Sequence, residues 1–402
     1  GLVLGISIII ALILANSPLQ EQYYRFFEHE FGFQFDGKPY LEYTIHSWIN
    51  DGLMAIFFFV VGLELKREIV AGELSNVRKA MLPIAAAIGG MLVPALIYIA
   101  LNPTGEVNDG WGIPMATDIA LALGVLYLLG NRIPLALKVF LTALAIVDDL
   151  GAVLVIAFFY TSHISINNLL IGFGFLSLMF LGNRLGVRNL FYYAFLGIVG
   201  LWTAFLLSGI HATIAAVLAA FMIPADVQIK ENIYIARIKK HLYQFMQADP
   251  DYDVPTVTPR QLYILDRVNA DTKKAMPPLQ RLEQALHPTV NFVILPIFAL
   301  ANAGVSFLDV DIQQLFSTNV ALGVALGLLL GKVIGIVGFT WIAFKLKIAP
   351  FPKGMNIKTL LGLALIASIG FTMSLFITQL AFTHEEYRAQ AKIGIFAASI
   401  IG

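Results

Sequence analysis

Long apolar stretches separated by polar connections dominate this chain and restrict what it can fold into. A helix needs about 20 apolar residues to cross the roughly 30 Å hydrocarbon layer of a membrane. With 58% hydrophobic and only 13% charged residues in 402, the composition lies far from that of soluble proteins. We therefore predict an all-α polytopic membrane protein, with one transmembrane domain over residues 1–402.

Twelve stretches have the length and composition of transmembrane helices, and an even number places both termini on one side. The first and last stretches begin and end the chain, so we expect that both native ends are trimmed. The expected spans are residues 1–16, 44–65, 81–101, 111–130, 135–160, 165–183, 190–207, 208–224, 285–306, 319–345, 357–381 and 387–402.

Lys and Arg are distributed unevenly over the connections between these spans. One side holds 21 of the 26 basic residues, whereas the other holds Arg25, Lys38, Arg388 and Lys392. Because basic connections stay in the cytoplasm, we predict cytoplasmic termini. The zero net charge gives no indication of nucleic-acid binding, and the absence of cysteine excludes disulfides and thiolate metal sites.

Two connections are long enough to have structure of their own. Residues 31–43 alternate aromatic residues around Asp36-Gly37, which predicts a small outer β-hairpin; an unstructured aromatic loop is the alternative. Residues 225–284 form the only sizeable polar segment, a long cytoplasmic loop between the eighth and ninth spans.

Within that loop, Gln228 to Gln247 has the pattern of a basic amphipathic helix, and Thr258-Pro259 has that of an N-cap followed by a first turn. The acidic residues of 249–253 would link the two helices. Three interpretations remain open: a helix lying on the anionic inner leaflet, a regulatory docking surface, or a plain linker.

Four charged residues are expected within the membrane, where an ionisable group costs several kcal/mol unless it is paired or solvated. Asp148 and Asp149 lie at the centre of one span, Lys332 at the centre of another, and Asp118 near the middle of a third. Neighbouring helical residues point about 100° apart, so one aspartate can pair with Lys332 while the other lines a cavity. A purely structural ion pair is the alternative for Lys332.

Two spans carry residues that interrupt helices. Pro114 and Thr117 precede Asp118, and Gly370 and Thr372 lie in the middle of the eleventh span. Each is the middle member of a triplet, spans three to five and ten to twelve, and the two middle members run in opposite directions. Interrupted helices at corresponding places of inverted repeats indicate a transport site.

Eight strings spread nearly end to end along the chain form a distinctive set. They are Asn50-Asp51-Gly52-Leu53-Met54-Ala55, Val61-Gly62-Leu63-Glu64-Leu65-Lys66-Arg67-Glu68, Ala116-Thr117-Asp118-Ile119-Ala120, Leu144-Ala145-Ile146-Val147-Asp148-Asp149-Leu150-Gly151-Ala152, Ser208-Gly209-Ile210-His211-Ala212-Thr213, Phe298-Ala299-Leu300-Ala301-Asn302-Ala303-Gly304-Val305, Gly331-Lys332 and Gly370-Phe371-Thr372-Met373-Ser374. By these strings the chain resembles the bacterial sodium/proton antiporters of the NhaA family, a family already known for inverted repeats and a site at mid-membrane.

The resemblance implies that Asp149 and Asp148 bind Na⁺ or Li⁺ and protons, and that Lys332 pairs with Asp148. Asp118 and Thr117 would lie where two unwound segments cross, with Asp118 compensating the helix ends more than it binds cation. The positions implied in pH regulation are Glu283, Glu64, Glu68 and His211, and Asp51 matches an acid near the outer end of the second span. Lipid contact and a homodimer joined through the outer hairpin, in the bacterial inner membrane, are also implied. Loop 225–284 is longer than expected for the family.

A carboxylate binds either a hard cation or protons, so the two compete for one site. If that site faces one side at a time, competition becomes exchange. The expected function is electrogenic exchange of cytoplasmic Na⁺ for external protons, serving sodium and pH homeostasis, with no cofactor and no enzymatic activity. The alternatives are an intramembrane aspartyl protease, whose Gly-x-Gly-Asp context is missing, a passive cation channel, and a proton-coupled carrier of an organic solute.

Overall fold

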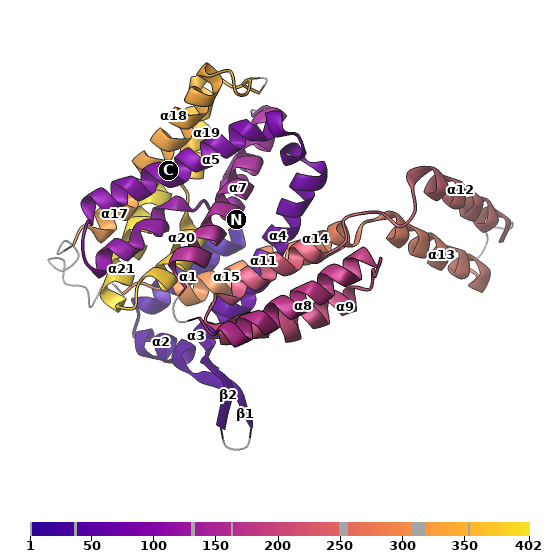
Figure 1. Cartoon of the computed structure of the whole chain (residues 1–402), viewed down its shortest axis with the longest axis horizontal. Helices are drawn as coiled ribbons and strands as arrows, with labels where there is room; N and C mark the ends of the chain where they lie inside the picture. Colours follow the sequence, from indigo (N-terminus) through magenta and orange to yellow (C-terminus); the bar gives the residue numbers. More distant parts are fainter. Residues whose placement is uncertain are drawn as a thin grey trace.

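The computed structural model describes residues 2–35, 38–129, 133–161, 164–248, 256–306, 318–352 and 354–402. It is mostly helical, with one pair of short strands (Figure 1). The elements up to the fifth expected span are α1 (Leu2–Ala15), α2 (Gln20–Glu28), β1 (Glu30–Phe35), β2 (Lys38–Thr44), α3 (Ile45–Ser47), α4 (Met54–Ala71), α5 (Val77–Leu101), a 3₁₀ segment (Glu106–Met115), α6 (Ile119–Leu128) and α7 (Leu135–Phe159).

Several helices contain one wider, π-type turn that joins two α-helical parts. Such turns occupy Trp48–Leu53, Leu196–Trp202, Val290–Ile294 and Gly327–Gly331. The remaining helices are α8 (Ile166–Arg184), α9 (Leu190–Phe195), α10 (Thr203–Ser208), α11 (Ala212–Met222), α12 (Glu231–Ala248), α13 (Pro259–Ala275), α14 (Pro278–Thr289), α15 (Leu295–Asn302), α17 (Val320–Leu326), α18 (Lys332–Lys345), α19 (Ile357–Ala367), α20 (Phe371–Ala381) and α21 (Glu385–Ile401).

Seven helices in the described part of the chain are long and apolar enough to cross a membrane, or up to nine if each of two bent pairs is one span. The bent pairs are α1 with α2, at 113°, and α19 with α20, at 49°. Helix lies in each of the twelve expected ranges. However, α11 has only 11 residues, and α4 and α21 carry charged residues that reduce their hydropathy. The chain is therefore a multi-pass membrane protein.

Both expected helix interruptions are present, and they lie against each other. The 3₁₀ segment ends at Met115 and α6 begins at Ile119, while α19 ends at Ala367 and α20 begins at Phe371. Where the two breaks meet, the backbone N–H of Asp118 donates to the carbonyl oxygen of Ile369 at 2.7 Å. Two segments about 250 residues apart in sequence thus form one crossing.

Helices α5 and α18 approach so closely that glycine is required where they touch. A Cβ added to Gly335 would lie 2.0 Å from the carbonyl oxygen of Gly89, and one added to Gly89 would lie 2.2 Å from that of Gly335. Close approach of this kind is how helices pack in a membrane, where small residues let backbones meet. It holds α18, which begins with Lys332, firmly against α5.

The expected β-hairpin is present as the antiparallel pair β1–β2. Glu30 pairs with Thr44 and Phe35 with Lys38, with an irregularity between Phe31 and Phe33. The Asp36-Gly37 turn lies outside the described residues. The hairpin projects from the helical bundle in a direction different from that of α12 and α13 (Figure 1).

The long polar loop contains two helices, α12 and α13, which pack side by side and extend away from the bundle (Figure 1). The expected N-cap is correct: the Thr258 hydroxyl accepts from the Gln261 N–H at 3.3 Å, and the Thr258 N–H donates to the Gln261 side chain at 2.8 Å. Helix α12 begins at Glu231 and not at Gln228, and the Gln228 N–H donates to the carbonyl of Lys274 at 3.0 Å. The acidic linker 249–253 lies outside the described residues.

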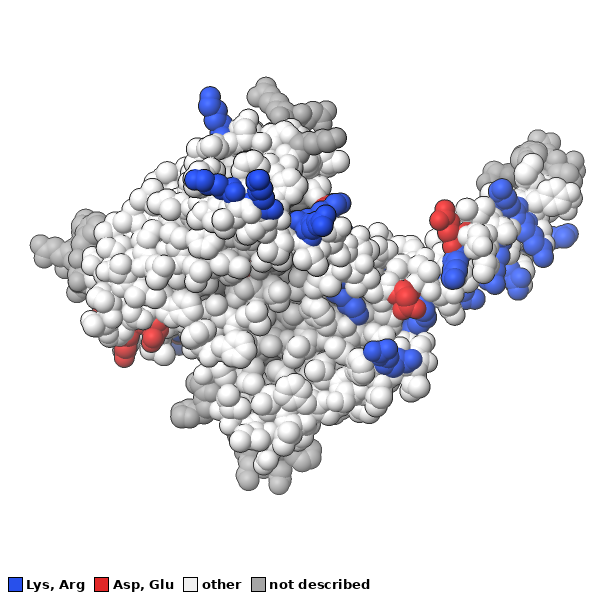
Figure 2. Space-filling model, turned by 45° about the horizontal axis from the view of Figure 1, so that its top comes forward, with Lys and Arg blue, Asp and Glu red and all other residues white. Residues whose placement is uncertain are grey.

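Basic side chains gather on this projecting pair of helices. In Figure 2, blue surface covers much of the α12–α13 arm and the neighbouring edge of the bundle, whereas little red is visible. Asp271 holds the pair together, because its carboxylate accepts from Arg237 at 3.1 Å and from His241 at 3.2 Å. Burial acts to raise the pKa of Asp271, but these hydrogen bonds and charges outweigh it and leave the pKa below its usual value.

Candidate functional site

Lys332 and Asp148 form a completely buried ion pair between α18 and α7. The side chains are 0% and 1% exposed, and the Lys332 ammonium donates to Asp148 Oδ2. Lys332 Nζ also donates to Thr117 Oγ1 at 2.6 Å. A buried charge is tolerated when it is paired and hydrogen-bonded, so the pair accounts for Lys332 and for one oxygen of Asp148.

Asp149 is buried next to this pair and has no such compensation. It is 0% exposed, and neither of its carboxylate oxygens has a hydrogen-bond partner; Asp148 Oδ1 is in the same state. The aspartate that does not pair with Lys332 was expected to line a cavity. Asp149 is not among the residues that line the cavity between α4, α6, α7 and α14. Three buried carboxylate oxygens without hydrogen-bond partners therefore lie on consecutive residues, and a proton or a cation would neutralise the charge that they carry.

Asp118 connects the beginnings of two helices. Its Oδ1 accepts from the Leu121 N–H at 2.9 Å, which caps α6, and its Oδ2 accepts from the Thr372 N–H at 2.9 Å and hydroxyl at 2.6 Å, in the first turn of α20. Helix N-termini carry partial positive charge, so the carboxylate is stabilised by both. This geometry agrees with a role at the helix ends.

Thr117 connects the same crossing to the buried ion pair. Its hydroxyl accepts from Lys332 and donates to the carbonyl of Ala367, the last residue of α19, at 3.0 Å. An ammonium group is therefore placed near a helix C-terminus, where positive charge is favourable. The crossing and the α7 aspartates form one polar centre inside an apolar bundle.

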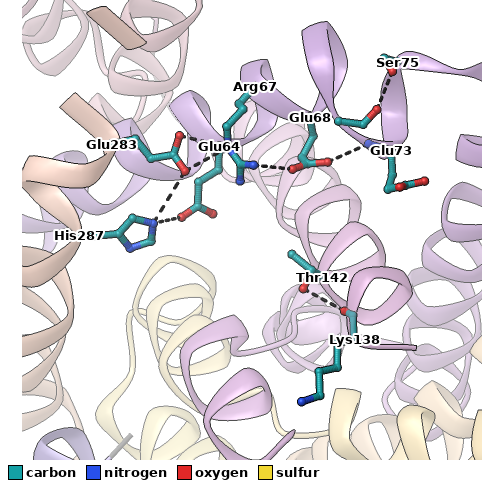
Figure 3. A network of polar contacts seen from close by, with 10 residues as sticks. Glu64, Arg67, Glu68, Glu73, Ser75, Lys138, Thr142, Glu283 and His287 are labelled. Carbon is teal, nitrogen blue, oxygen red and sulfur yellow. Dashed lines mark hydrogen bonds and ion pairs between the residues drawn. The ribbon is translucent and has the colours of Figure 1, made fainter. Parts of the chain in front are cut away.

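A second polar cluster lies on α4 and α14 (Figure 3). Arg67 Nε donates to both oxygens of Glu283 at 3.1 Å, and Arg67 Nη1 lies 3.0 Å from Glu68 Oε1. His287 Nε2 lies 2.8 Å from Glu64 Oε1. The cluster borders a cavity of about 710 Å³, lined also by residues of α6 and α7, among them Thr142 and Ile146.

The structure brings together some of the sequence-predicted site residues and separates others. Asp148, Asp149, Lys332, Thr117 and Asp118 meet at the crossing, with Thr372 contributed by α20. Glu64, Glu68 and Glu283 meet in the second cluster.

Other predicted residues lie elsewhere. His211 is the residue before α11, where its ring Nε2 donates to the carbonyl of Tyr160 at 2.8 Å, and it belongs to neither group. Asp51 lies in the turn before α4, where its carbonyl accepts from the Trp202 indole at 3.1 Å. Pro114 packs against Gly327, and Gly370 is the residue before α20.

The sequence reasoning missed several residues of these networks. His287 and Arg67 were not singled out, although the spacing of four between Glu283 and His287 on one helix was a usable signal. A chain of the partly buried His46 and the buried Asn50 and Asn302 was missed as well: Asn302 Nδ2 donates to Asn50 Oδ1 at 3.0 Å, and Asn302 Oδ1 lies 3.0 Å from His46 Nε2. Asn50 and Asn302 fall inside the matching strings, but no residue pattern pointed to His46.

These features define the class: a multi-pass membrane protein built around two interrupted, crossing helices with buried ionisable residues. The family model described as Na⁺/H⁺ antiporter 1 matches residues 1–402, so the chain belongs to that family. It is 49% identical to the Na(+)/H(+) antiporter NhaA of Oleidesulfovibrio alaskensis, over 100% of this chain and 88% of that protein. It is 48% identical to the protein of that name from Acidithiobacillus ferrooxidans, over 100% of this chain and 92% of that protein.

Proposed function

We propose that this chain exchanges Na⁺ for protons across the membrane. The observation that carries the proposal is Asp149, a fully buried carboxylate whose two oxygens have no hydrogen-bond partner. Na⁺ and Li⁺ are hard cations that take oxygen ligands, and protons neutralise the same group, so occupancy by one excludes the other. Family membership over the whole chain supports the same exchange.

The buried pair gives the exchange its charge balance. Cation binding at Asp149 and Asp148 would have to replace protons there, and Lys332 lies close enough to change state with them. If more than one proton returns for each cation, net charge crosses the membrane and the membrane potential drives the cycle. In the proposed cycle more than one proton returns for each cation, so the cycle is electrogenic, and the site opens to one side at a time.

The topology completes the proposal. All twelve helical ranges cross the bilayer, and spans three to five and ten to twelve are inverted repeats whose middle members carry the two interruptions. Both termini are cytoplasmic, and the membrane is the bacterial inner membrane. Since the sequence contains no cysteine, single cysteines can report sidedness. Labelling from one side should reach Glu73→Cys and Glu231→Cys, and labelling from the other should reach Glu106→Cys.

The β1–β2 hairpin is the proposed homodimer contact. A two-stranded sheet is marginally stable alone, and its free edges can pair with those of a second copy. Deletion of residues 31–43 should then convert a dimer in detergent into a monomer. A dimer that persists in detergent after the deletion would refute this contact.

The exchange itself is tested in proteoliposomes that contain a pH-sensitive dye. Addition of Na⁺ or Li⁺, but not of an inert cation, should change the internal pH, and Asp149→Asn should abolish the response. Asp266→Asn, on the exposed surface of α13, is the matched control and should respond like the unchanged protein. A cation channel would pass Na⁺ without moving protons in the opposite direction. Robust ΔpH-driven Na⁺ efflux by Asp149→Asn would overturn the assignment.

A further inference from the structure

Three side chains of the second cluster have the composition and spacing of a metal-binding site. Glu64 on α4 and Glu283 and His287 on α14 each offer one ligand atom, and these atoms all lie within 4.8 Å of one another. Glu283 and His287 are four residues apart on one helix and therefore point the same way (Figure 3).

We propose that Glu64, Glu283 and His287 bind a divalent transition-metal ion of the Zn²⁺ type. One imidazole nitrogen and two carboxylate oxygens are a donor set that suits Zn²⁺, with a water molecule as fourth ligand. Zn²⁺ bonds of about 2.1 Å in a tetrahedron place ligand atoms roughly 3.4 Å apart. His287 Nε2 is now 2.8 Å from Glu64 Oε1 and 4.0 Å from Glu283 Oε1, so shifts of about 1 Å complete the geometry.

Charge in the cluster favours a dication. Glu64, Glu68 and Glu283 bring three carboxylates, and Arg67 is the guanidinium that pairs with two of them, Glu68 and Glu283. Zn²⁺ would compete with Arg67 for Glu283. Arg67 could then keep its contact with Glu68, whose other oxygen accepts from the Glu73 N–H at 3.0 Å. Arg67 therefore opposes metal binding without being a ligand.

The metal would lie at a cavity that reaches to within one helical turn of the α7 aspartates. Glu64, Arg67 and His287 line the cavity of about 710 Å³, and so does Ile146, which is one helical turn before Asp149. The His287 side chain is 42% exposed, so an ion can reach it from the solvent. A bound metal would narrow the cavity and place positive charge in it, and would thereby slow Na⁺ entry. This inhibition rests on the proposed exchange, whereas the binding does not.

Binding is tested with the purified full chain in lipid nanodiscs. Equilibrium dialysis against Zn²⁺ should show one binding site. Its affinity should fall at least roughly 10- to 100-fold in Glu64→Gln, Glu283→Gln and His287→Ala, because loss of a residue that only supports a ligand already costs that much. The exposed Glu73→Gln should bind like the unchanged protein, and Arg67→Gln should bind more tightly. Co²⁺ in place of Zn²⁺ should give an intense visible absorption band, which His287→Ala loses.

Each outcome decides the proposal. Loss in all three ligand variants, with Glu73→Gln unchanged and all variants equally monodisperse, supports the site. Unchanged Zn²⁺ affinity in His287→Ala, or equal loss in Glu73→Gln, overturns it.

Inhibition is tested separately in the dye assay. Zn²⁺ should slow the Na⁺ response of the unchanged protein severalfold. The Na⁺ response of His287→Ala should be the same with and without Zn²⁺. A Na⁺ response that is unchanged when Zn²⁺ is bound would overturn the proposed inhibition but not the proposed metal binding. Absence of any Na⁺ response before Zn²⁺ is added would instead contradict the proposed exchange.

Discussion

Asp148 and Asp149 are consecutive on α7 and equally buried, yet Asp148 is bonded to the Lys332 ammonium whereas neither oxygen of Asp149 has a hydrogen-bond partner. Their difference follows from helix geometry, because neighbouring side chains point about 100° apart and a single lysine cannot meet both. One acid is therefore fixed in an ion pair while the other is left available. This asymmetry suits the proposed exchange, in which Asp149 binds cation and proton in turn.

Removal of Lys332 should destabilise the protein strongly, because it leaves Asp148 as an unpaired charge in the bundle interior. We expect Lys332→Ala to cost about 3–5 kcal/mol of the free energy of unfolding. The double variant Lys332→Ala with Asp148→Asn should recover much of that loss. Chemical unfolding in detergent measures both; equal losses in the single and double variants would mean that the ion pair is not the cause.

Asp118 should matter for stability through two helices at once. Each N-cap contributes about 1 kcal/mol, so Asp118→Ala should cost about 2 kcal/mol. Asp118→Asn should cost about half of that, because the amide keeps one acceptor oxygen and can still cap one of the two helices. Asp109→Ala is the control, since this exposed residue contributes a backbone carbonyl that the substitution keeps. The midpoints of thermal unfolding give the comparison, and identical midpoints for the alanine and asparagine variants at position 118 would argue against capping.

Because α5 and α18 are in close contact, replacement of one glycine of α18 by alanine should destabilise the protein, whereas replacement of another should not. Gly335→Ala places a methyl group 2.0 Å from the Gly89 carbonyl oxygen and should cost about 1–3 kcal/mol or more. Gly338→Ala lies on the same helix with no atom within 4 Å, so it should be neutral or slightly stabilising. Thermal unfolding of the two variants tests this, and a similar loss in both would show that helix packing is not the reason.

The α12–α13 arm should depend on pH through Asp271. Because the pKa of Asp271 is lowered in the folded arm, its contribution to stability is complete above the ordinary value of 3.8 and is lost as the pH falls through the lowered pKa. Asp271→Asn should therefore increase amide hydrogen exchange in both helices at pH 7, and this difference should disappear at strongly acid pH. Asp266→Asn, exposed on the same helix, should leave exchange unchanged. A difference that persists at acid pH would contradict the ionic explanation.

The buried charges could be predicted from the sequence because hydrocarbon makes them conspicuous. Asp148, Asp149, Asp118 and Lys332 stand in apolar runs, and no structural information is needed to see that each requires a partner or a function. The pairing of Lys332 with Asp148 came from the family resemblance, since spacing alone left either aspartate as its partner. The structure agrees with that pairing.

The second cluster could be predicted only in part. The spacing of four between Glu283 and His287 is a local signal. Nothing local shows that Arg67 joins Glu283 across 216 residues of sequence. Helix packing could not be predicted from the sequence either.

The sequence has 33 glycines, and only the three-dimensional arrangement shows that Gly335 meets a neighbouring backbone.

The single Asp118 side chain that reaches both α6 and α20 restricts how this protein can move. A displacement that parted the two interrupted helices would leave one of them without its anionic partner, while a displacement that carried both would leave every bond of the carboxylate intact. The crossing therefore behaves as one mechanical unit. In the proposed exchange, opening toward either aqueous compartment would then slide other parts of the bundle past this junction.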